Sequence, residues 1–430
     1  MKGILVLLDG LGDLPCKQLN DKTPLEAAET PNLDFFSARG EMGYMYPLEE
    51  LKIPESHESI LSIFGNDTRE SSRGQLEARG ADIKLVRGDL ALRANFATID
   101  SLKEGNIIDR RVGRTLTTEE AKILAKEINK IKIPCEFIFK PTIQHRGVLV
   151  LRGGFSDNIT SNDRFYSEHG MTKNKISIFK PADDEENTKY TVNVLNEFME
   201  KVYYVLENHP VNIQRKKKGL LPANFLLMRG AGIEQPKLKF YRRWMAIAYM
   251  PLEIGFAKLS GMKVFSFDYP RLKNFDVYEN LNEGLKEACE FTIKTIKKNY
   301  KDFDYAYVHI KETDIPGHDN KPIEKKNMIE YIDKTLFKFL KEFAALKGIK
   351  ILVTGDHSTP CKLKSHSTDP VPVLFYNMKI KIQRFNFFPV LRKKEEKPLK
   401  EIIKFSEKNA RLGSLGRIYG NQLLSITGFN

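Results

Sequence analysis

Three short apolar runs, far apart in the chain, each lead into carboxylate or imidazole side chains. The runs are residues 3–8, 305–310 and 349–354. The polar residues that follow them are Asp9, Asp314, His318, Asp356, His357 and His366. Short apolar runs between turn signals are typical of buried strands, and ligands of open parallel sheets bind beyond the carboxyl ends of the strands. The sequence therefore predicts an α/β fold in which both ends of the chain build one metal site.

The length of the chain and the change of secondary-structure pattern along it predict two domains. Its 430 residues are more than one hydrophobic core usually accommodates. Alternating strand and helix patterns in residues 1–67 and 237–430 predict a mostly parallel sheet flanked by helices. Residues 68–236 mix short alternating runs with helical patterns, which indicates an α+β unit. Because Asp9 has to join strands near the other end of the chain, this middle part is predicted to be a domain inserted into a discontinuous core.

Local patterns give more specific expectations for individual helices. Thr30, followed by Pro31, predicts a helix that the threonine side chain caps. Residues 321–346 carry an apolar stripe at helical spacing and predict one long amphipathic helix. The segment 314–318 contains a proline and a glycine, which favour a loop over a helical turn.

The composition argues against several classes of protein. A formal net charge of +13 favours anionic partners, but no nucleic-acid-binding motif accompanies it, so nucleic-acid binding is not favoured. No apolar run approaches the roughly 20 residues that span a bilayer, and the N-terminus lacks the pattern of a signal peptide. Isolated cysteines argue against disulfides and thiolate zinc sites and predict a cytoplasmic protein without membrane association. They are Cys16, Cys135, Cys289 and Cys361. An oligomer remains compatible with the sequence.

The residue types at the ends of the runs narrow the choice of metal. Carboxylates and imidazoles without thiolates suit Mn, Zn, Co or Fe, whereas Mg favours sites with fewer histidines. An isolated Asp–His pair in a loop is usually a turn residue beside a surface histidine, and His145 and His309 are interpreted as surface or satisfied strand positions. Three of the eight histidines, however, lie next to or near an aspartate after apolar strands. Together with Asp9, they favour the metal site.

Ser56 is the best candidate for a nucleophile. It follows Pro54 at the start of a predicted helix that ends at Gly65. Backbone N–H groups at a helix N-terminus favour an anion, and a dinuclear metal site usually activates a nucleophile and stabilises charge on a phosphoryl group. The alternative is an ordinary N-cap serine, which is the more common case when the local sequence is considered alone.

Six segments of the chain resemble one known family. They are residues 8–13, 23–28, 95–98, 229–232, 355–369 and 415–420. Over nearly its whole length the sequence resembles the archaeal type of cofactor-independent (2,3-bisphosphoglycerate-independent) phosphoglycerate mutase, a branch of the alkaline phosphatase superfamily. The metal segments and residues 356–372 are the most specific parts of the resemblance. It implies an alkaline-phosphatase-like sheet that carries the inserted domain.

The resemblance also implies an activity and a set of site residues. The activity is the interconversion of 3-phosphoglycerate and 2-phosphoglycerate in glycolysis and gluconeogenesis, through a phosphoserine on Ser56 and without bisphosphoglycerate. Two divalent ions are implied, with manganese the first choice and magnesium, cobalt or zinc as alternatives. Their implied ligands are Asp9, Ser56, Asp356 and His357 for one ion, and Asp314, His318 and His366 for the other. Arginine suits bidentate recognition of carboxylate and phosphate. The candidate substrate-binding arginines are Arg93, Arg110, Arg111, Arg114, Arg152 and Arg229.

The chain differs from the family pattern at two places. The family usually carries an aspartate directly after the serine and a histidine four residues beyond it, where this chain has His57 and Ile60. It also tends to carry a lysine where this chain has Ile254, and His57 and Lys258 are the candidates to substitute. These differences keep two alternatives open. One is a phosphatase or phosphotransferase that acts on another small phosphate ester, and the other is a catalytically degenerate paralogue that acts as a binding partner.

Overall fold

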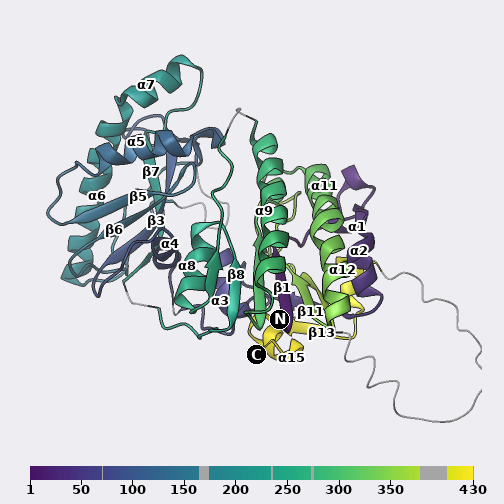
Figure 1. Ribbon diagram of the computed structural model, residues 1–430. Helices are drawn as coiled ribbons and strands as arrows, with labels where there is room; N and C mark the ends of the chain where they lie inside the picture. The colour runs from purple at the N-terminus through teal and green to yellow at the C-terminus, as the bar shows by residue number, and fades with distance from the viewer. Residues whose placement is uncertain (70, 164–173, 234–235, 273–275, 378–403, 430) are drawn as a thin grey trace, which may run out of the picture.

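The computed structural model describes residues 1–429 except 70, 164–173, 234–235, 273–275 and 378–403, and it contains two β-sheets (Figure 1). The strands of the larger sheet are β1 (Gly3–Leu8), β2 (Glu41–Tyr46), β8 (Trp244–Ile247), β9 (Lys263–Phe265), β10 (Tyr305–Ile310), β11 (Lys350–Thr354), β12 (Val371–Tyr376) and β13 (Gly416–Tyr419). They lie in the order β13-β2-β12-β11-β1-β10-β8-β9. Strand β12 is antiparallel to both of its neighbours, and the other pairs are parallel.

Helices cover both faces of the larger sheet. One face packs against α1 (Pro24–Ala27), α2 (Pro31–Ser37), α9 (Val277–Asn299), α11 (Pro322–Ile332) and α12 (Lys338–Lys347), and the other against α3 (Ser56–Ile63), α8 (Pro251–Leu259) and α15 (Leu423–Thr427). Alternate side chains of β1 divide between the two faces: Ile4, Val6 and Leu8 join the first hydrophobic cluster, and Leu5 and Leu7 join the second. The predicted α/β class, a mostly parallel sheet flanked by helices, is confirmed.

The smaller sheet is antiparallel and lies within residues 68–236. Its strands are β3 (Leu90–Ile99), β4 (Ile107–Asp109), β5 (Phe137–Pro141), β6 (Arg146–Leu151) and β7 (Phe225–Gly232). They pair in the order β4-β3-β6-β5, and β7 also pairs with β3. The helices α5 (Thr118–Ile128), α6 (Glu186–Glu207) and α7 (Pro210–Lys217) belong to this part of the chain (Figure 1). Its separate hydrophobic cluster supports the domain boundaries, which stay a prediction.

The two sheets are joined where α4 (Arg73–Gly80) packs against α8. Glycines permit this contact, because a Cβ atom on Gly80 would lie 1.8 Å from the carbonyl oxygen of Pro251. A Cβ atom on Gly255 would lie 1.7 Å from the carbonyl oxygen of Leu76. No side chain fits at either distance. The close contact fixes the position of the smaller sheet beside the first turn of α8.

The structure corrects two of the local predictions. Thr30 precedes α2 but makes no side-chain cap hydrogen bond. The Asp333 carboxylate instead accepts the backbone N–H groups of Asn32 at 3.2 Å and Leu33 at 2.7 Å. Residues 321–346 form α11 and α12 separated by a π-helical turn, Asp333–Phe337, rather than one continuous α-helix. The π-turn that interrupts the helix contains the aspartate that satisfies the N-terminus of α2.

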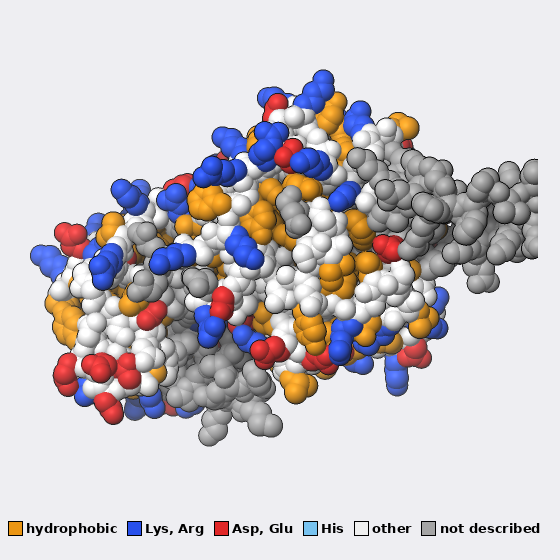
Figure 2. All heavy atoms as spheres, turned by 90° about the horizontal axis from the view of Figure 1, so that it is seen from below, with side chains coloured by type: hydrophobic (Ala, Val, Ile, Leu, Met, Phe, Trp, Pro, Cys, Tyr) orange, Lys and Arg blue, Asp and Glu red, His pale blue; other side chains and the backbone are white. Residues whose placement is uncertain are grey.

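Short helices complete the described chain. They are the 3-10 turns Lys17–Leu19, Val112–Arg114 and Gly420–Gln422, and the helices α10 (Asp314–His318) and α14 (Glu407–Arg411). None of the helices in the described ranges is long and apolar enough to cross a membrane. On the face seen in Figure 2, Lys and Arg side chains are spread among acidic and apolar ones rather than gathered into one continuous basic surface.

Candidate metal centre

The topology of the larger sheet brings three polar loops to one edge. Strand β1 lies between β10 and β11, with Leu8 paired to Ile310 and Leu7 paired to Thr354. Since the three strands are parallel, their carboxyl ends lie side by side. Asp9 directly follows β1, Asp314 begins α10 shortly after β10, and Asp356 follows β11 by two residues. Carboxylates from both ends of the chain therefore meet at this edge.

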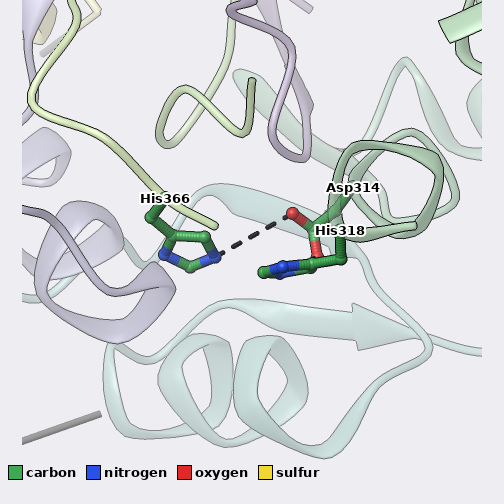
Figure 3. Close-up of side chains that lie close together, drawn as sticks. All are labelled: Asp314, His318 and His366. Carbon is green, nitrogen blue, oxygen red and sulfur yellow. Dashed lines mark ion pairs between the residues drawn. The ribbon is translucent and has the colours of Figure 1, made fainter. Parts of the chain in front are cut away.

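One cluster of possible metal ligands lies around α10. Asp314, His318 and His366 can each offer one atom to a common ion (Figure 3). The Nε2 atom of His318 is 3.3 Å from Asp314 Oδ2, and that of His366 is 3.9 Å from Asp314 Oδ1. The predicted loop at 314–318 is wrong, because these residues form one helical turn. Pro316 lies within its first turn, where the missing N–H would have no helical partner anyway.

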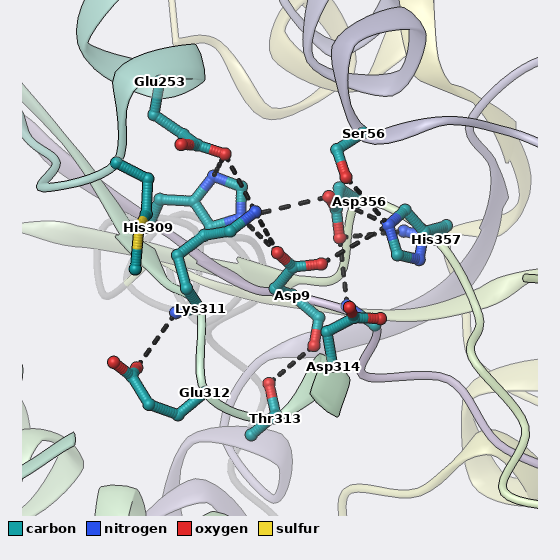
Figure 4. Close-up of polar contacts among 12 residues, drawn as sticks. Asp9, Ser56, Glu253, His309, Lys311, Glu312, Thr313, Asp314, Asp356 and His357 are labelled. Atoms are coloured by element: carbon teal, nitrogen blue, oxygen red, sulfur yellow. Dashed lines mark hydrogen bonds and ion pairs between the residues drawn. The ribbon is translucent and has the colours of Figure 1, made fainter. Parts of the chain in front are cut away.

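A second cluster surrounds His357 (Figure 4). Its Nε2 atom lies 3.4 Å from Asp9 Oδ1, 3.4 Å from Asp356 Oδ2 and 3.1 Å from Ser56 Oγ. Two atoms that bind the same ion at about 2.1 Å are roughly 3.0–3.4 Å apart at tetrahedral to octahedral angles. These separations thus fit one ion bound by the four residues. Ser56 is the first residue of α3 and is buried.

Buried polar atoms without hydrogen-bond partners also fit a cation. Among the described residues, Asp9 Oδ1, Asp356 Oδ2 and His309 Nε2 are buried and lack such partners. An unpaired buried acceptor is costly unless an ion or a donor satisfies it. Burial and, next, the neighbouring Asp356 carboxylate raise the pKa of Asp9, and burial raises the pKa of Asp356. A divalent cation would remove the repulsion between the two carboxylates.

The histidines are oriented so that Nε2 faces the site. His318 Nδ1 donates to a backbone carbonyl at 3.0 Å, and His366 Nδ1 donates to another at 2.8 Å. Thr359 Oγ1 donates to Asp314 Oδ1 at 2.8 Å and accepts from His357 Nδ1 at 3.0 Å. Burial lowers the pKa of His357 and of His366 to about 3. With Nδ1 engaged in this way, each ring turns its unprotonated Nε2 towards the site, which is the form that binds metals.

Several polar residues of the site were not identified from the sequence. Lys311, one residue beyond β10, makes a close ion pair with Asp9 and another with Glu253 Oε1 at 2.8 Å. The His309 ring is fully buried; Tyr307 contacts its Nδ1 at 2.8 Å, and its Nε2 lies 3.9 Å from Asp9 Oδ2. Both residues lie at the carboxyl end of β10, a strand that the sequence predicts. The expectation that polar residues at the carboxyl ends of parallel strands form the site, which indicated Asp314, also applies to Lys311 and His309.

His57 and Lys258, the candidates to replace the polar residues of the family pattern, lie in different places. Lys258 pairs with Asp82 and does not line the cavity that contains Ser56. Ile254 is also absent from the lining, whereas its neighbour Glu253 is part of it. His57 follows Ser56, and burial lowers its pKa to about 4. The cationic side chain nearest the candidate ligands is therefore that of Lys311.

Four of the six candidate arginines line the cavity that contains Ser56, and two of these four also line an adjoining cleft. Arg93, Arg111, Arg114 and Arg229 line the cavity that also contains Asp9, Ser56, Asp314, His318 and His366. Two arginines that the sequence did not single out, Arg73 and Arg146, line it as well. Arg110 lines a neighbouring cleft of about 1140 Å³ and forms an ion pair with Asp163. Arg152 lines neither of these two spaces and pairs with Asp89.

Comparisons with known proteins point to one family. A family model described as 2,3-bisphosphoglycerate-independent phosphoglycerate mutase matches residues 37–212. The enzyme of that name from Pyrococcus abyssi is 37% identical, over 99% of this chain and 96% of its own. The one from Methanosphaera stadtmanae is 36% identical, over 99% and 97%.

Solved structures agree with these relatives. The PH0037 protein from Pyrococcus horikoshii superposes with a TM-score of 0.71 at 30% identity, covering 99% of this chain and 96% of its own. The cofactor-independent phosphoglycerate mutase from Thermoplasma acidophilum has a TM-score of 0.54 at 29% identity, covering 100% and 99%. The similarity in both sequence and fold thus extends over the whole chain.

Proposed function

The chain belongs to the family of 2,3-bisphosphoglycerate-independent phosphoglycerate mutases, and from this premise we propose that it interconverts 3-phosphoglycerate and 2-phosphoglycerate through a phosphoserine on Ser56. Membership follows from 37% identity to a relative over nearly the full length of both chains. An enzyme of this family is a metal-dependent isomerase of a small phosphate ester and needs no bisphosphoglycerate. We place the reaction in glycolysis and gluconeogenesis in the cytoplasm, where the free cysteines of the described chain would stay reduced.

The position of Ser56 is the observation that supports this mechanism most strongly. Its hydroxyl lies at the N-terminus of α3, where backbone N–H groups favour a phosphoryl group. The hydroxyl donates to His357 Nε2 at 3.1 Å, and the Asp9 and Asp356 carboxylates lie beside that ring. The same hydroxyl faces the cavity that arginines line. A phosphate ester bound in this cavity would meet the serine oxygen directly.

We propose that one divalent ion is held by Asp9, Ser56, Asp356 and His357 and a second by Asp314, His318 and His366. When bound, the ions would stabilise negative charge on the phosphoryl oxygens and on the serine oxygen. Manganese is the first choice because the ligands are carboxylates and imidazoles without thiolates; magnesium, cobalt and zinc remain alternatives.

The proposed transfer has two steps. The Ser56 hydroxyl gives up its proton as Oγ attacks phosphorus, the bond from phosphorus to the 3-oxygen of the substrate breaks, and the freed glycerate oxygen takes up one proton in exchange. Glycerate then reorients while arginines such as Arg93 and Arg229 hold its carboxylate. Its 2-hydroxyl loses a proton and attacks phospho-Ser56, which breaks the serine–phosphorus bond and restores the hydroxyl. Phosphorus, charge and protons balance, so no second phosphate donor is required.

Replacement of Ser56 tests the proposal. Ser56→Ala, loaded with manganese, should lose interconversion by on the order of a thousandfold or more, because its nucleophile is gone. Ser62→Ala is the matched control: this serine lies on the same helix and is equally buried, but it does not line the cavity. Full interconversion by Ser56→Ala would overturn the mechanism. Release of inorganic phosphate instead of 2-phosphoglycerate by the wild type would favour the phosphatase alternative.

A further inference from the structure

Glu55, the residue immediately before Ser56, places a carboxylate of the protein itself among the arginines. Its Oε1 atom lies 2.9 Å from Arg229 Nη1, and its Oε2 atom lies 3.1 Å from Arg73 Nη1. Glu55 is therefore a carboxylate that is ion-paired with two arginines in the cavity that contains Ser56.

The arginines that Glu55 contacts belong to the smaller sheet and its neighbouring helix. Arg229 lies on β7, and Arg73 is the first residue of α4. Arg73 also pairs with Glu77 at 2.8 Å, and Arg93 pairs with the same carboxylate at 3.1 Å. Glu55 and these arginines line the cavity that contains Ser56. The ion pairs of Glu55 thus connect the larger part of the chain to arginines that are expected to bind the substrate.

A phosphoglycerate whose phosphorus meets Ser56 Oγ has its carboxylate only a few bonds away. Arginine guanidinium groups bind a carboxylate through charge-assisted hydrogen bonds, and Arg229 and Arg73 already bind one from Glu55. We infer that Glu55 competes with the substrate carboxylate for Arg73 and Arg229 and so sets the affinity for phosphoglycerate. The identity of the substrate in this inference rests on the proposed function.

The local structure allows the exchange without refolding. Glu55 is the N-cap of α3, and Glu58 accepts its backbone N–H at 3.2 Å, so the backbone there is held independently of the ion pairs with the two arginines. The Glu55 side chain is 21% exposed and also lines the adjoining cleft. A substrate that brings both a carboxylate and a phosphate would displace it, whereas a phosphate ester without a carboxylate would leave it in place.

Binding measurements on a non-reacting enzyme test the competition. Manganese-loaded Ser56→Ala is titrated calorimetrically with 3-phosphoglycerate and with glycerol 3-phosphate, which lacks the carboxylate. Adding Glu55→Gln should tighten binding of 3-phosphoglycerate about fivefold to tenfold, the size expected when a partly exposed ion pair no longer has to be broken. Binding of glycerol 3-phosphate should change less than about twofold by the same reasoning.

Glu58→Gln is the matched control. It removes the same charge from the same helical turn, and the amide oxygen can still accept the Glu55 N–H, but Glu58 pairs with Lys52 and does not line the cavity. It should leave both affinities unchanged, and thermal unfolding checks that each variant is folded. The inference would be overturned if Glu55→Gln raised the affinity for both ligands equally, or did not raise the affinity for 3-phosphoglycerate. It would also be overturned if no variant bound 3-phosphoglycerate. Because nothing is turned over, these outcomes are independent of whether Ser56 carries the phosphoryl group.

Discussion

Among the single residues of the site, Lys311 controls the charge balance. Burial favours the neutral amine, but Asp9 and Glu253 outweigh it and raise the pKa of Lys311 above its ordinary value. The ammonium group is thus retained and balances two buried carboxylates. In the absence of metal it supplies positive charge next to Asp9. A metal ion bound by Asp9 would take over part of this role.

Removing this charge should destabilise the metal-free enzyme. Lys311→Met is expected to lower the free energy of unfolding by about 3 kcal/mol, because breaking a buried ion pair leaves carboxylates uncompensated. Manganese should reduce the loss by neutralising Asp9. Lys258→Met, which breaks an exposed pair with Asp82, should cost less than about 1 kcal/mol. Urea unfolding with and without manganese measures both variants, and equal losses in the two would contradict the role of Lys311.

Much of the residue set at the sheet edge can be predicted, because carboxylates that follow several parallel strands meet at one edge of the sheet. Asp9, Asp314 and Asp356 follow from that rule. The placement of Glu55, Arg73 and other cavity residues could not be predicted, since it depends on how α4 packs against α8. Single-residue patterns do not encode a contact between units that are far apart in the chain.

At the scale of elements, a buried lysine on α11 joins two loops that follow strands. Lys325 Nζ donates to Asp13 Oδ2 at 2.8 Å, to the carbonyl oxygen of Thr359 at 3.0 Å and to that of Gly12 at 3.3 Å. Neither the Lys325 nor the Asp13 side chain is exposed. One loop follows Asp9, and the other contains the threonine that orients His357. The lysine therefore holds the ligand-bearing loops together.

Lys325→Met is expected to destabilise the protein by about 3 to 5 kcal/mol, because it leaves a buried carboxylate unpaired. The loops would also lose their common anchor, so manganese should bind more weakly. Lys326→Met provides a neighbouring control, since Lys326 pairs with Glu330 one helical turn away and both side chains are partly exposed. This substitution should lower the free energy of unfolding by about 0.5 kcal/mol. Chemical unfolding and manganese titration compare the two. A similar effect of both substitutions would contradict the proposed anchor.

The elements that the sequence predicts least well are those stabilised by distant partners. The strands at 305–310 and 350–354 follow from their apolar runs alone. The π-turn Asp333–Phe337 does not, because its aspartate is held by the N-terminus of α2, about 300 residues away in the chain. The Asp314–His318 turn contains a proline that usually signals a loop.

At the scale of the whole molecule, residues beside the smaller sheet contact residues on and near the helices of the larger part. Arg114, beside the smaller sheet, forms an ion pair with Asp319 at 2.5 Å, and Tyr278 donates to the same carboxylate at 2.9 Å. Gln144 donates to Asn280 at 3.1 Å. The candidate ligands follow strands of the larger sheet, whereas Arg93 and Arg229 lie on strands of the smaller sheet. Residues of both parts therefore line one cavity.

Metal removal should affect the stability of the whole molecule. A ligand that binds only the native state stabilises it by about 2.7 kcal/mol when its free concentration is 100 times its Kd. Chelation should thus lower the unfolding free energy and abolish interconversion, and manganese should restore both. His366→Ala should reduce the manganese effect, whereas His209→Ala, on a surface helix far from the ligand clusters, should keep it. Unfolding that is independent of manganese in the wild type would contradict a bound ion.

The most direct test of the central claim is to find where the phosphoryl group resides during turnover. Manganese-loaded enzyme is mixed with 3-phosphoglycerate, quenched in acid and digested, and its peptides are analysed by mass spectrometry. Transfer through this serine predicts a peptide that carries one phosphoryl group on Ser56. The Ser56→Ala variant should give no such phosphorylated peptide. A phosphoryl group on another residue, or an unmodified protein under conditions of turnover, would contradict it.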